Sequence, residues 1–271
     1  MLNVGRLLGG ETSGLIPIRD APKAERALVF IHGFRTNSRE TWGLARDSYF
    51  WPFDIGQSLG AAVYCYEYLN KTFRGTGRAS LAHNLVANQL LYEMAQTAHQ
   101  RFVLITHSFG GIVAKQAFVN ALLGEPQDRD IAHRIFGFAA FACPNYGHWL
   151  AHINYRGYLW GRLSSPNANL LRPGNKVMRN LHTEFMARRA EFQNLDAMTI
   201  AEGGYTARFF KIPRGDAHAI AEHNHDSELN HREICRCLDP STPEWQWIYD
   251  FAQRRFSSEN RRRIPLGRSG K

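Results

Sequence analysis

The stretch that decides the fold is Arg101-Phe-Val-Leu-Ile-Thr-His-Ser-Phe-Gly-Gly-Ile-Val-Ala-Lys-Gln116. Its first residues are apolar, as in a short buried strand, and its last residues are typical of a helix. Ser108 lies at the break between the two. A serine in a strand–turn–helix context is characteristic of a nucleophile elbow, in which a sharp turn exposes the hydroxyl above the end of a sheet. Thr106 and Gly110 supply the small flanking residues, with threonine where glycine is usual.

A second apolar run, Arg26-Ala-Leu-Val-Phe-Ile-His-Gly-Phe34, supports this interpretation. A Ser-Phe-Gly-Gly turn can also simply end a strand, but an earlier strand that ends in His-Gly favours an oxyanion hole beside the serine. The backbone N–H groups of Phe34 and Phe109 are the candidate donors. Such donors act through the backbone, so the identity of their side chains matters little.

Composition indicates a globular chain with one core. The chain has 271 residues, of which 44% are apolar and 21% charged, as in ordinary globular proteins. We therefore expect one domain over residues 1–271. No apolar run is long enough for a transmembrane helix, and the N-terminus does not resemble a signal peptide.

Cysteine usage favours a reducing, cytoplasmic location. The four cysteines, Cys65, Cys143, Cys235 and Cys237, are too few for a disulfide framework in a chain of this length. The Cys-Arg-Cys spacing at residues 235–237 does not match the common zinc sites. We expect no metal and no cofactor.

The formal charge is +9, and much of the excess lies in a basic tail over residues 257–271. We interpret this tail as a solvated, frayed terminus. The alternative is weak contact with anionic lipid or nucleic acid, but no nucleic-acid motif accompanies the charge.

Apolar runs and helical periodicity alternate along the chain. We expect strands at 14–19, 26–32, 61–68, 101–106, 135–143, 198–202 and 208–212, helices at 79–99, 109–123 and from 243 onward, a helical or mixed segment at 38–59, a mostly helical insertion at 145–195 and a long polar loop at 213–242. This alternation predicts an α/β fold with a mostly parallel sheet and helices on both faces.

A serine nucleophile requires a base to accept its proton and an acid to orient that base. In chains with a nucleophile elbow the order is serine, acid, histidine, so the base is sought late in the sequence. The candidates are His218, His223, His225 and His231, which all lie in the expected polar loop. Position alone does not choose among them.

The chain resembles the lipase/esterase branch of the α/β hydrolases that includes the GPI-inositol-deacylase-like and serine-active-site-containing proteins. The resemblance covers residues 26–253. Its matching pieces are Val29-Phe-Ile-His-Gly-Phe34 with Trp42, His107-Ser-Phe-Gly-Gly-Ile-Val-Ala-Lys-Gln-Ala117, Ala142-Cys-Pro-Asn-Tyr-Gly147 and Asn230-His-Arg-Glu-Ile-Cys235.

The resemblance implies an α/β-hydrolase fold with a Ser-His-acid triad. Ser108 matches the nucleophile, His231 the base and Glu202 the acid, with Asp216 and Asp196 as alternative acids. The sequence departs from the family at Asn145, where a histidine is usual, and this departure bears on the shape of the pocket.

The function that we expect is hydrolysis of carboxylic esters through an acyl-enzyme. An acyltransferase or amidase with the same triad, and a binding protein on a hydrolase fold, are the alternatives. A metal site built from His218, His223, His225, Asp226 and His231 has irregular spacing, which a polar surface loop explains better.

The insertion at 145–195 is where such enzymes place a cap over the site. Its aromatic residues include Trp149, Tyr155, Tyr158 and Trp160. These side chains either line an acyl pocket or pack the cap on the core.

Overall fold

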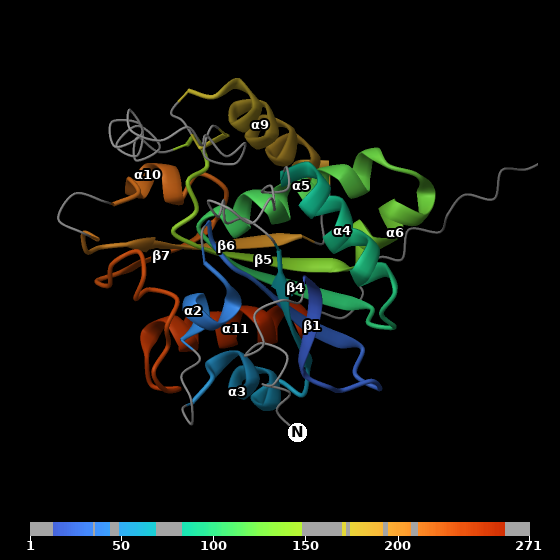
Figure 1. The fold of residues 1–271 in the computed structure, drawn as a ribbon, viewed down its shortest axis with the longest axis horizontal. Helices are drawn as coiled ribbons and strands as arrows, with labels where there is room; N and C mark the ends of the chain where they lie inside the picture. The colour runs from blue at the N-terminus through green and yellow to red at the C-terminus, as the bar shows by residue number, and fades with distance from the viewer. Residues whose placement is uncertain are drawn as a thin grey trace, which may run out of the picture.

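The computed structural model describes residues 13–34, 36–43, 49–68, 83–147, 170–171, 174–191, 195–206 and 211–257. Within these residues a seven-stranded sheet has the order β1-β3-β2-β4-β5-β6-β7 (Figure 1). Its strands are β1 (Gly14–Arg19), β2 (Arg26–Ile31), β3 (Ala62–Glu67), β4 (Arg101–His107), β5 (Ile135–Phe141), β6 (Asp196–Glu202) and β7 (His223–Ser227). Of the described strands, only β1 runs antiparallel to its neighbour, so the predicted mostly parallel sheet is confirmed.

Helices cover both faces of the sheet, as predicted. In Figure 1 the upper layer holds α4 (His83–Ala95), α5 (Phe109–Leu123), α6 (Pro126–Arg134) and α9 (Lys176–Glu191). The lower layer holds α2 (Ser38–Trp42), α3 (Trp51–Ser58) and α11 (Pro243–Ser257). The short α10 (Arg214–Ala217) contacts β6.

The central strand β4 shows why these strands are apolar along their whole length. Phe102 and Leu104 point into the core cluster on the side of α5, whereas Val103 and Ile105 point into the cluster on the side of α11. Because side chains alternate between the two faces and both faces are covered, every position favours an apolar residue.

Of the strand predicted at 208–212, the structure describes only Lys211 and Ile212, which lie outside any strand. The last described strand is β7, within the segment expected to be a polar loop, so His223 and His225 lie on a strand. Among the described strands, β7 pairs with β6 alone. Because it is a largely exposed edge strand, it lacks the apolar signal on which sequence reasoning depends.

The segment predicted as a cap divides into two parts. Helix α9 packs in the upper layer, where Phe185 contacts Phe118 and Phe138 at ring-centroid distances of 5.6 and 5.8 Å. Helix α9, in the second part of the segment, therefore belongs to the hydrophobic core of the domain. Residues 148–169, which include the four aromatic cap residues, lie outside the described residues, as does the tail from residue 258. The cap stays a prediction for 148–169.

Candidate active site

Ser108 forms the turn between β4 and α5, at the carboxyl edge of the sheet. Its φ and ψ are 52° and −118°, a region that non-glycine residues rarely adopt and that stores strain. The Ser108 N–H donates a 2.8 Å hydrogen bond to the carbonyl of Phe141 in β5. The side chain is partly exposed. The turn therefore has the geometry expected of a nucleophile elbow.

Thr106 replaces the usual first glycine of the elbow, and the structure shows how it is accommodated. Its buried hydroxyl donates a 3.2 Å hydrogen bond to the carbonyl of Ala139 in β5. A Cβ built on Gly111 would lie 2.5 Å from Cys143 Sγ and 3.3 Å from this hydroxyl, so the threonine packs beside a glycine. Gly111 is therefore required by its contact with Cys143.

The peptide between Gly33 and Phe34 has a fixed orientation. The carbonyl oxygen of Gly33 accepts hydrogen bonds from His32 Nδ1 at 2.9 Å and from Thr36 Oγ1 at 3.1 Å. The described chain has no cis peptide bond, so the N–H of Phe34 points away from that carbonyl. His32 is itself held by stacking on Tyr68, with ring centroids 4.2 Å apart.

The two candidate oxyanion donors belong to adjacent turns. Phe109 is the first residue of α5, so its N–H lies at the positive end of the helix dipole, where an anion is favoured. The rings of Phe34 and Phe109 are in van der Waals range, with centroids 5.9 Å apart. Both amides therefore come from the carboxyl ends of neighbouring strands β2 and β4.

Glu202, the last residue of β6, lies beside His231. Its Oε2 is 3.3 Å from His231 Nδ1, and its Oε1 accepts a hydrogen bond from the N–H of Ile212. Glu202 is buried and the His231 side chain is 12% exposed. The separation exceeds the 2.7–2.9 Å of a short charge-assisted bond, as is common for catalytic hydrogen bonds before a substrate binds.

The alternative acids lie elsewhere. Asp196 is at the opposite end of β6, 3.2 Å from Arg255 and 3.4 Å from His223. Asp216 accepts a 2.8 Å hydrogen bond from the N–H of Tyr146. Of the three carboxylates considered, Glu202 is the one that pairs with His231.

The alternative histidines have other partners. His218 Nε2 lies 3.1 Å from Asp226 Oδ1, His223 pairs with Asp196, and His225 stacks on Trp247 with centroids 4.5 Å apart. Among the described residues, no group of three or more His, Cys, Asp or Glu side chains is arranged to hold a metal ion.

The backbone of His231 is held on both sides. Its N–H donates to Thr206 Oγ1 at 3.1 Å, and its carbonyl lies 2.8 Å from the ring Nε2 of His107. His107 is the residue before Ser108. The strand that carries the serine therefore contacts the loop that carries the histidine.

A buried polar cluster lies on the same helix as the elbow. Lys115 is fully buried in α5 and donates a 2.8 Å hydrogen bond to Asn145 Oδ1. The Asn145 amide donates to the carbonyl of Asp216 at 2.6 Å. Burial lowers the pKa of Lys115 and raises the pKa of Asp216 to about 6. Sequence reasoning missed Lys115, although a lysine within the apolar first half of this helix was a signal.

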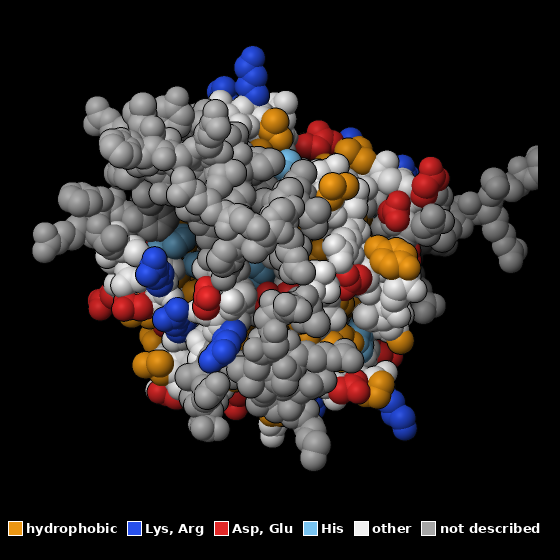
Figure 2. All heavy atoms as spheres, viewed as in Figure 1, with side chains coloured by type: hydrophobic (Ala, Val, Ile, Leu, Met, Phe, Trp, Pro, Cys, Tyr) orange, Lys and Arg blue, Asp and Glu red, His pale blue; other side chains and the backbone are white. Residues whose placement is uncertain are grey.

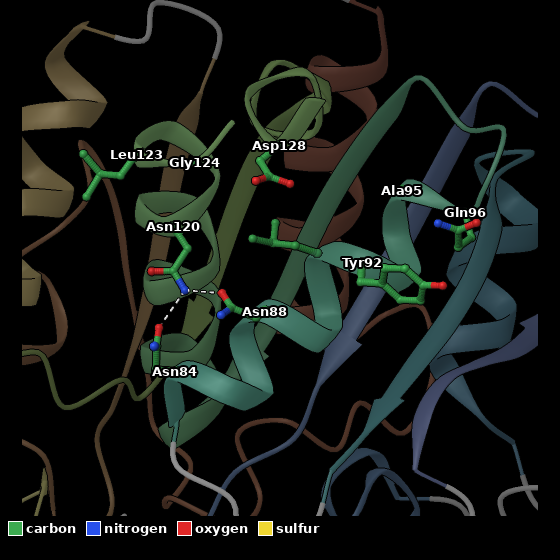
Figure 3. Close-up of a pocket in the computed structure, with 10 residues that line it drawn as sticks. Asn84, Asn88, Tyr92, Ala95, Gln96, Asn120, Leu123, Gly124 and Asp128 are labelled. Carbon is green, nitrogen blue, oxygen red and sulfur yellow. Dashed lines mark hydrogen bonds between the residues drawn. The ribbon is translucent and has the colours of Figure 1, made fainter. Parts of the chain in front are cut away.

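A groove on the outer surface is separate from these residues (Figure 3). It has a volume of about 730 Å³ and lies between α4, the carboxyl end of α5 and the start of α6. Asn120 donates to Asn84 and Asn88 in it. Asn120 lies about 16 Å along the α5 axis from Phe109, at 1.5 Å per residue, so this groove does not contain Ser108.

In the view of Figure 2, Lys and Arg side chains lie among Asp and Glu side chains over the described surface. Within the same residues, no helix is long and apolar enough to cross a membrane.

A family model described as "Alpha/beta hydrolase family" matches residues 28–259. The chain belongs to this family. The match includes the elbow and the Glu202–His231 pair, so the chain is an α/β hydrolase in fold and in family. No curated protein matched it in sequence.

Solved α/β hydrolases share this fold at low sequence identity. Phospholipase PlaB from Legionella pneumophila is 15% identical with a TM-score of 0.61, over 84% of this chain and 59% of that one. Bacillus licheniformis lipase BlEst2 in its propeptide form is 15% identical with a TM-score of 0.58, over 85% and 52%. A Pyrobaculum calidifontis esterase is 14% identical with a TM-score of 0.52, over 89% and 80%. The α/β hydrolase described here thus spans little more than half the length of the first two.

Proposed function

We propose that this α/β hydrolase cleaves carboxylic esters through an acyl-enzyme formed on Ser108. The observation that carries the proposal is the 3.3 Å pair of Glu202 and His231, joined through His107 to the strained turn of Ser108. The Bacillus licheniformis lipase and the Pyrobaculum calidifontis esterase share this fold, which is consistent with this chemistry.

In the first step His231 Nε2 accepts the proton of Ser108 Oγ while that oxygen attacks the acyl carbon. The C=O electron pair moves to the carbonyl oxygen, and the N–H groups of Phe34 and Phe109 stabilise the resulting oxyanion. Removal of one such donor from a serine hydrolase reduces kcat by about 10²–10³-fold. The tetrahedral intermediate collapses when His231 returns the proton to the leaving alcohol.

Glu202 acts on His231 throughout. Its Oε2 accepts a hydrogen bond from the Nδ1–H, which fixes the tautomer with Nε2 free to act as the base, and its charge stabilises the imidazolium. The N–H of Ile212 on Oε1 keeps the carboxylate turned toward the histidine. In the second half of the cycle water replaces the serine oxygen as nucleophile and releases the acid.

Fluorophosphonate labelling combined with ester hydrolysis tests the proposal. We expect the wild type to be labelled at Ser108 and to hydrolyse p-nitrophenyl esters. Ser108→Ala and His231→Ala should fold and lose turnover by several orders of magnitude, whereas His223→Ala and His225→Ala should retain it. Ordinary hydrolysis by folded Ser108→Ala would refute the proposal.

The same experiment separates the alternatives. An acyltransferase would transfer the acyl group to an added alcohol or amine in preference to water, and an amidase would cleave anilides as fast as the matching esters. A series of acyl lengths tests the predicted cap, because each buried methylene contributes about 0.8 kcal/mol. Trp149→Ala and Trp160→Ala should then lose activity selectively on longer chains.

A further inference from the structure

The His107 ring lies between the two loops that serve Ser108. On one side its Nε2 is 2.8 Å from the carbonyl oxygen of His231, and the two imidazole centroids are 4.8 Å apart. On the other side a Cβ built on Gly33 would lie 3.0 Å from His107 Nδ1 and 3.3 Å from Ser108 Cβ. The ring therefore fills the space between the loop that carries His231 (the base loop) and the turn at Gly33 and Phe34 (the oxyanion loop).

The hydrogen bond defines the state of this ring. A carbonyl oxygen only accepts, so the proton is on Nε2 of His107. The ring is 5% exposed, and burial, with the neighbouring His231 adding to it, keeps the pKa of His107 well below its usual range. His107 is thus a neutral donor, and its unprotonated Nδ1 faces Gly33.

Contacts with described residues restrain His231. Its N–H donates to Thr206 Oγ1 at 3.1 Å, its carbonyl accepts from His107, and its Nδ1 faces Glu202. The bond to His107 differs from the other two because its donor is covalently adjacent to Ser108. It therefore restrains the distance between the base loop and the nucleophile.

We propose that His107 is a positioning residue that holds His231 where its ring can accept the proton of Ser108. The proposal rests on the proposed function, in which Ser108 is the nucleophile and His231 the base. Misplacement of reacting groups by about 1 Å reduces a rate by about 10²-fold, and this is the effect that we expect when the restraint is lost.

Two substitutions isolate the hydrogen bond. His107→Leu has a similar volume and no donor, so we expect kcat to fall about 10²-fold with KM within about threefold of wild type. His107→Gln carries an amide N–H near the position of Nε2 and should restore kcat to within about tenfold of wild type. Failure of rescue in folded His107→Gln contradicts the hydrogen-bonding role.

A double-mutant cycle separates positioning from a general structural effect. If His107 acts through His231, then His107→Leu introduced into His231→Ala should leave the residual rate unchanged. If the residual rate falls again by the same factor, the two effects are independent and the proposal is overturned. A rate near that of the wild type in His231→Ala alone would refute the proposed function instead, so the two failures are distinguishable.

His99 provides a matched control. It is a buried histidine whose Nδ1 lies 2.6 Å from the carbonyl of Ala24 and whose Nε2 lies 2.9 Å from the Tyr64 hydroxyl, at the end of the sheet away from Ser108. His99→Leu should lower Tm and leave the kcat of the folded protein unchanged. If His107→Leu and the unbranched His107→Met both fail to fold while His99→Leu folds, the role of His107 is in the core and the proposal is wrong.

Discussion

Gly110 packs directly on the backbone at the end of β2: a Cβ placed on it would lie 2.3 Å from the carbonyl oxygen of Ile31. The same Cβ would lie 2.6 Å from the carbonyl of His32. The first turn of α5 and the oxyanion loop are therefore in contact through main-chain atoms, which do not move aside as side chains do. The absence of a Cβ at this position lets the turn of Ser108 approach Phe34.

Gly110→Ala should separate these two turns. We expect a loss of about 1–3 kcal/mol of the free energy of unfolding, because overpacking forces a backbone shift, and a fall in kcat in the protein that folds. Urea denaturation and ester hydrolysis measure the two effects. The matched control is Gly215→Ala, since nothing lies within 4 Å of its Cβ. Equal stability changes in both variants would contradict the packing argument.

Ser108→Gly should make the protein more stable and inactive. The φ of 52° at Ser108 is strained for a residue with a Cβ and unstrained for glycine, so we expect a gain of about 1 kcal/mol in the free energy of unfolding. Ser108→Ala should lose the same activity without the gain, because it keeps the Cβ. Thermal denaturation compares the two variants, and an equal gain in Ser108→Ala would show that the strain lies elsewhere.

Glu202→Gln should reduce kcat by about 10²–10⁴-fold, because the amide favours the wrong tautomer of His231 and removes the charge opposite the imidazolium. KM should change little. Asp196→Asn, at the other end of β6, is the control and should keep the wild-type kcat once folded. If Asp196→Asn lost activity and Glu202→Gln kept it, the acid would be Asp196 and the assignment of Glu202 would be wrong.

Asp216 should make the protein less stable as pH rises from 4 to 7. Burial raises its folded-state pKa to about 6, from an ordinary value of 3.8, so between these values the folded state holds a proton that the unfolded state has released. The stabilisation is complete below pH 4 and is lost as pH rises through 6, by an amount on the order of 1–3 kcal/mol.

Asp216→Asn should remove that pH dependence, since its side chain stays neutral and its Oδ1 still accepts from Tyr146. Denaturant unfolding at pH 4, 5, 6 and 7 gives the difference between wild type and variant. Asp239 is a control because its pKa is shifted in the opposite direction: the Ser241 hydroxyl lowers it. Asp239→Asn should therefore affect stability only above its own pKa. A difference between wild type and Asp216→Asn that does not change with pH would contradict the assignment.

Local signals in the sequence predicted the centre of the fold. The helix expected at 109–123 matches α5 at both ends, and β4 extends one residue beyond the prediction. An apolar run, a serine, two glycines and a helical period are all encoded within sixteen consecutive residues. The choice of Glu202 and His231 came from the resemblance to a known family, since position alone left four histidines open, and the structure places the two side chains 3.3 Å apart.

Sequence patterns did not reveal secondary structure in segments that are not buried, because exposure does not select apolar residues. Strand β7 is polar because it lies at an edge and pairs with one neighbour, so it lacked the apolar alternation that reveals a strand. Helix α9 was interpreted as part of a cap, although Phe185 packs into the core against α5.

By itself the sequence determined the order and type of the central elements and the position of Ser108 between two of them, because those features depend on residues close together in the chain. Only the tertiary structure decided which polar groups meet. His107 and His231 are 124 positions apart, and Lys115 and Asn145 are 30 apart. Such pairs carry no local pattern, since their partners are brought within reach only when the sheet and its two helical layers pack.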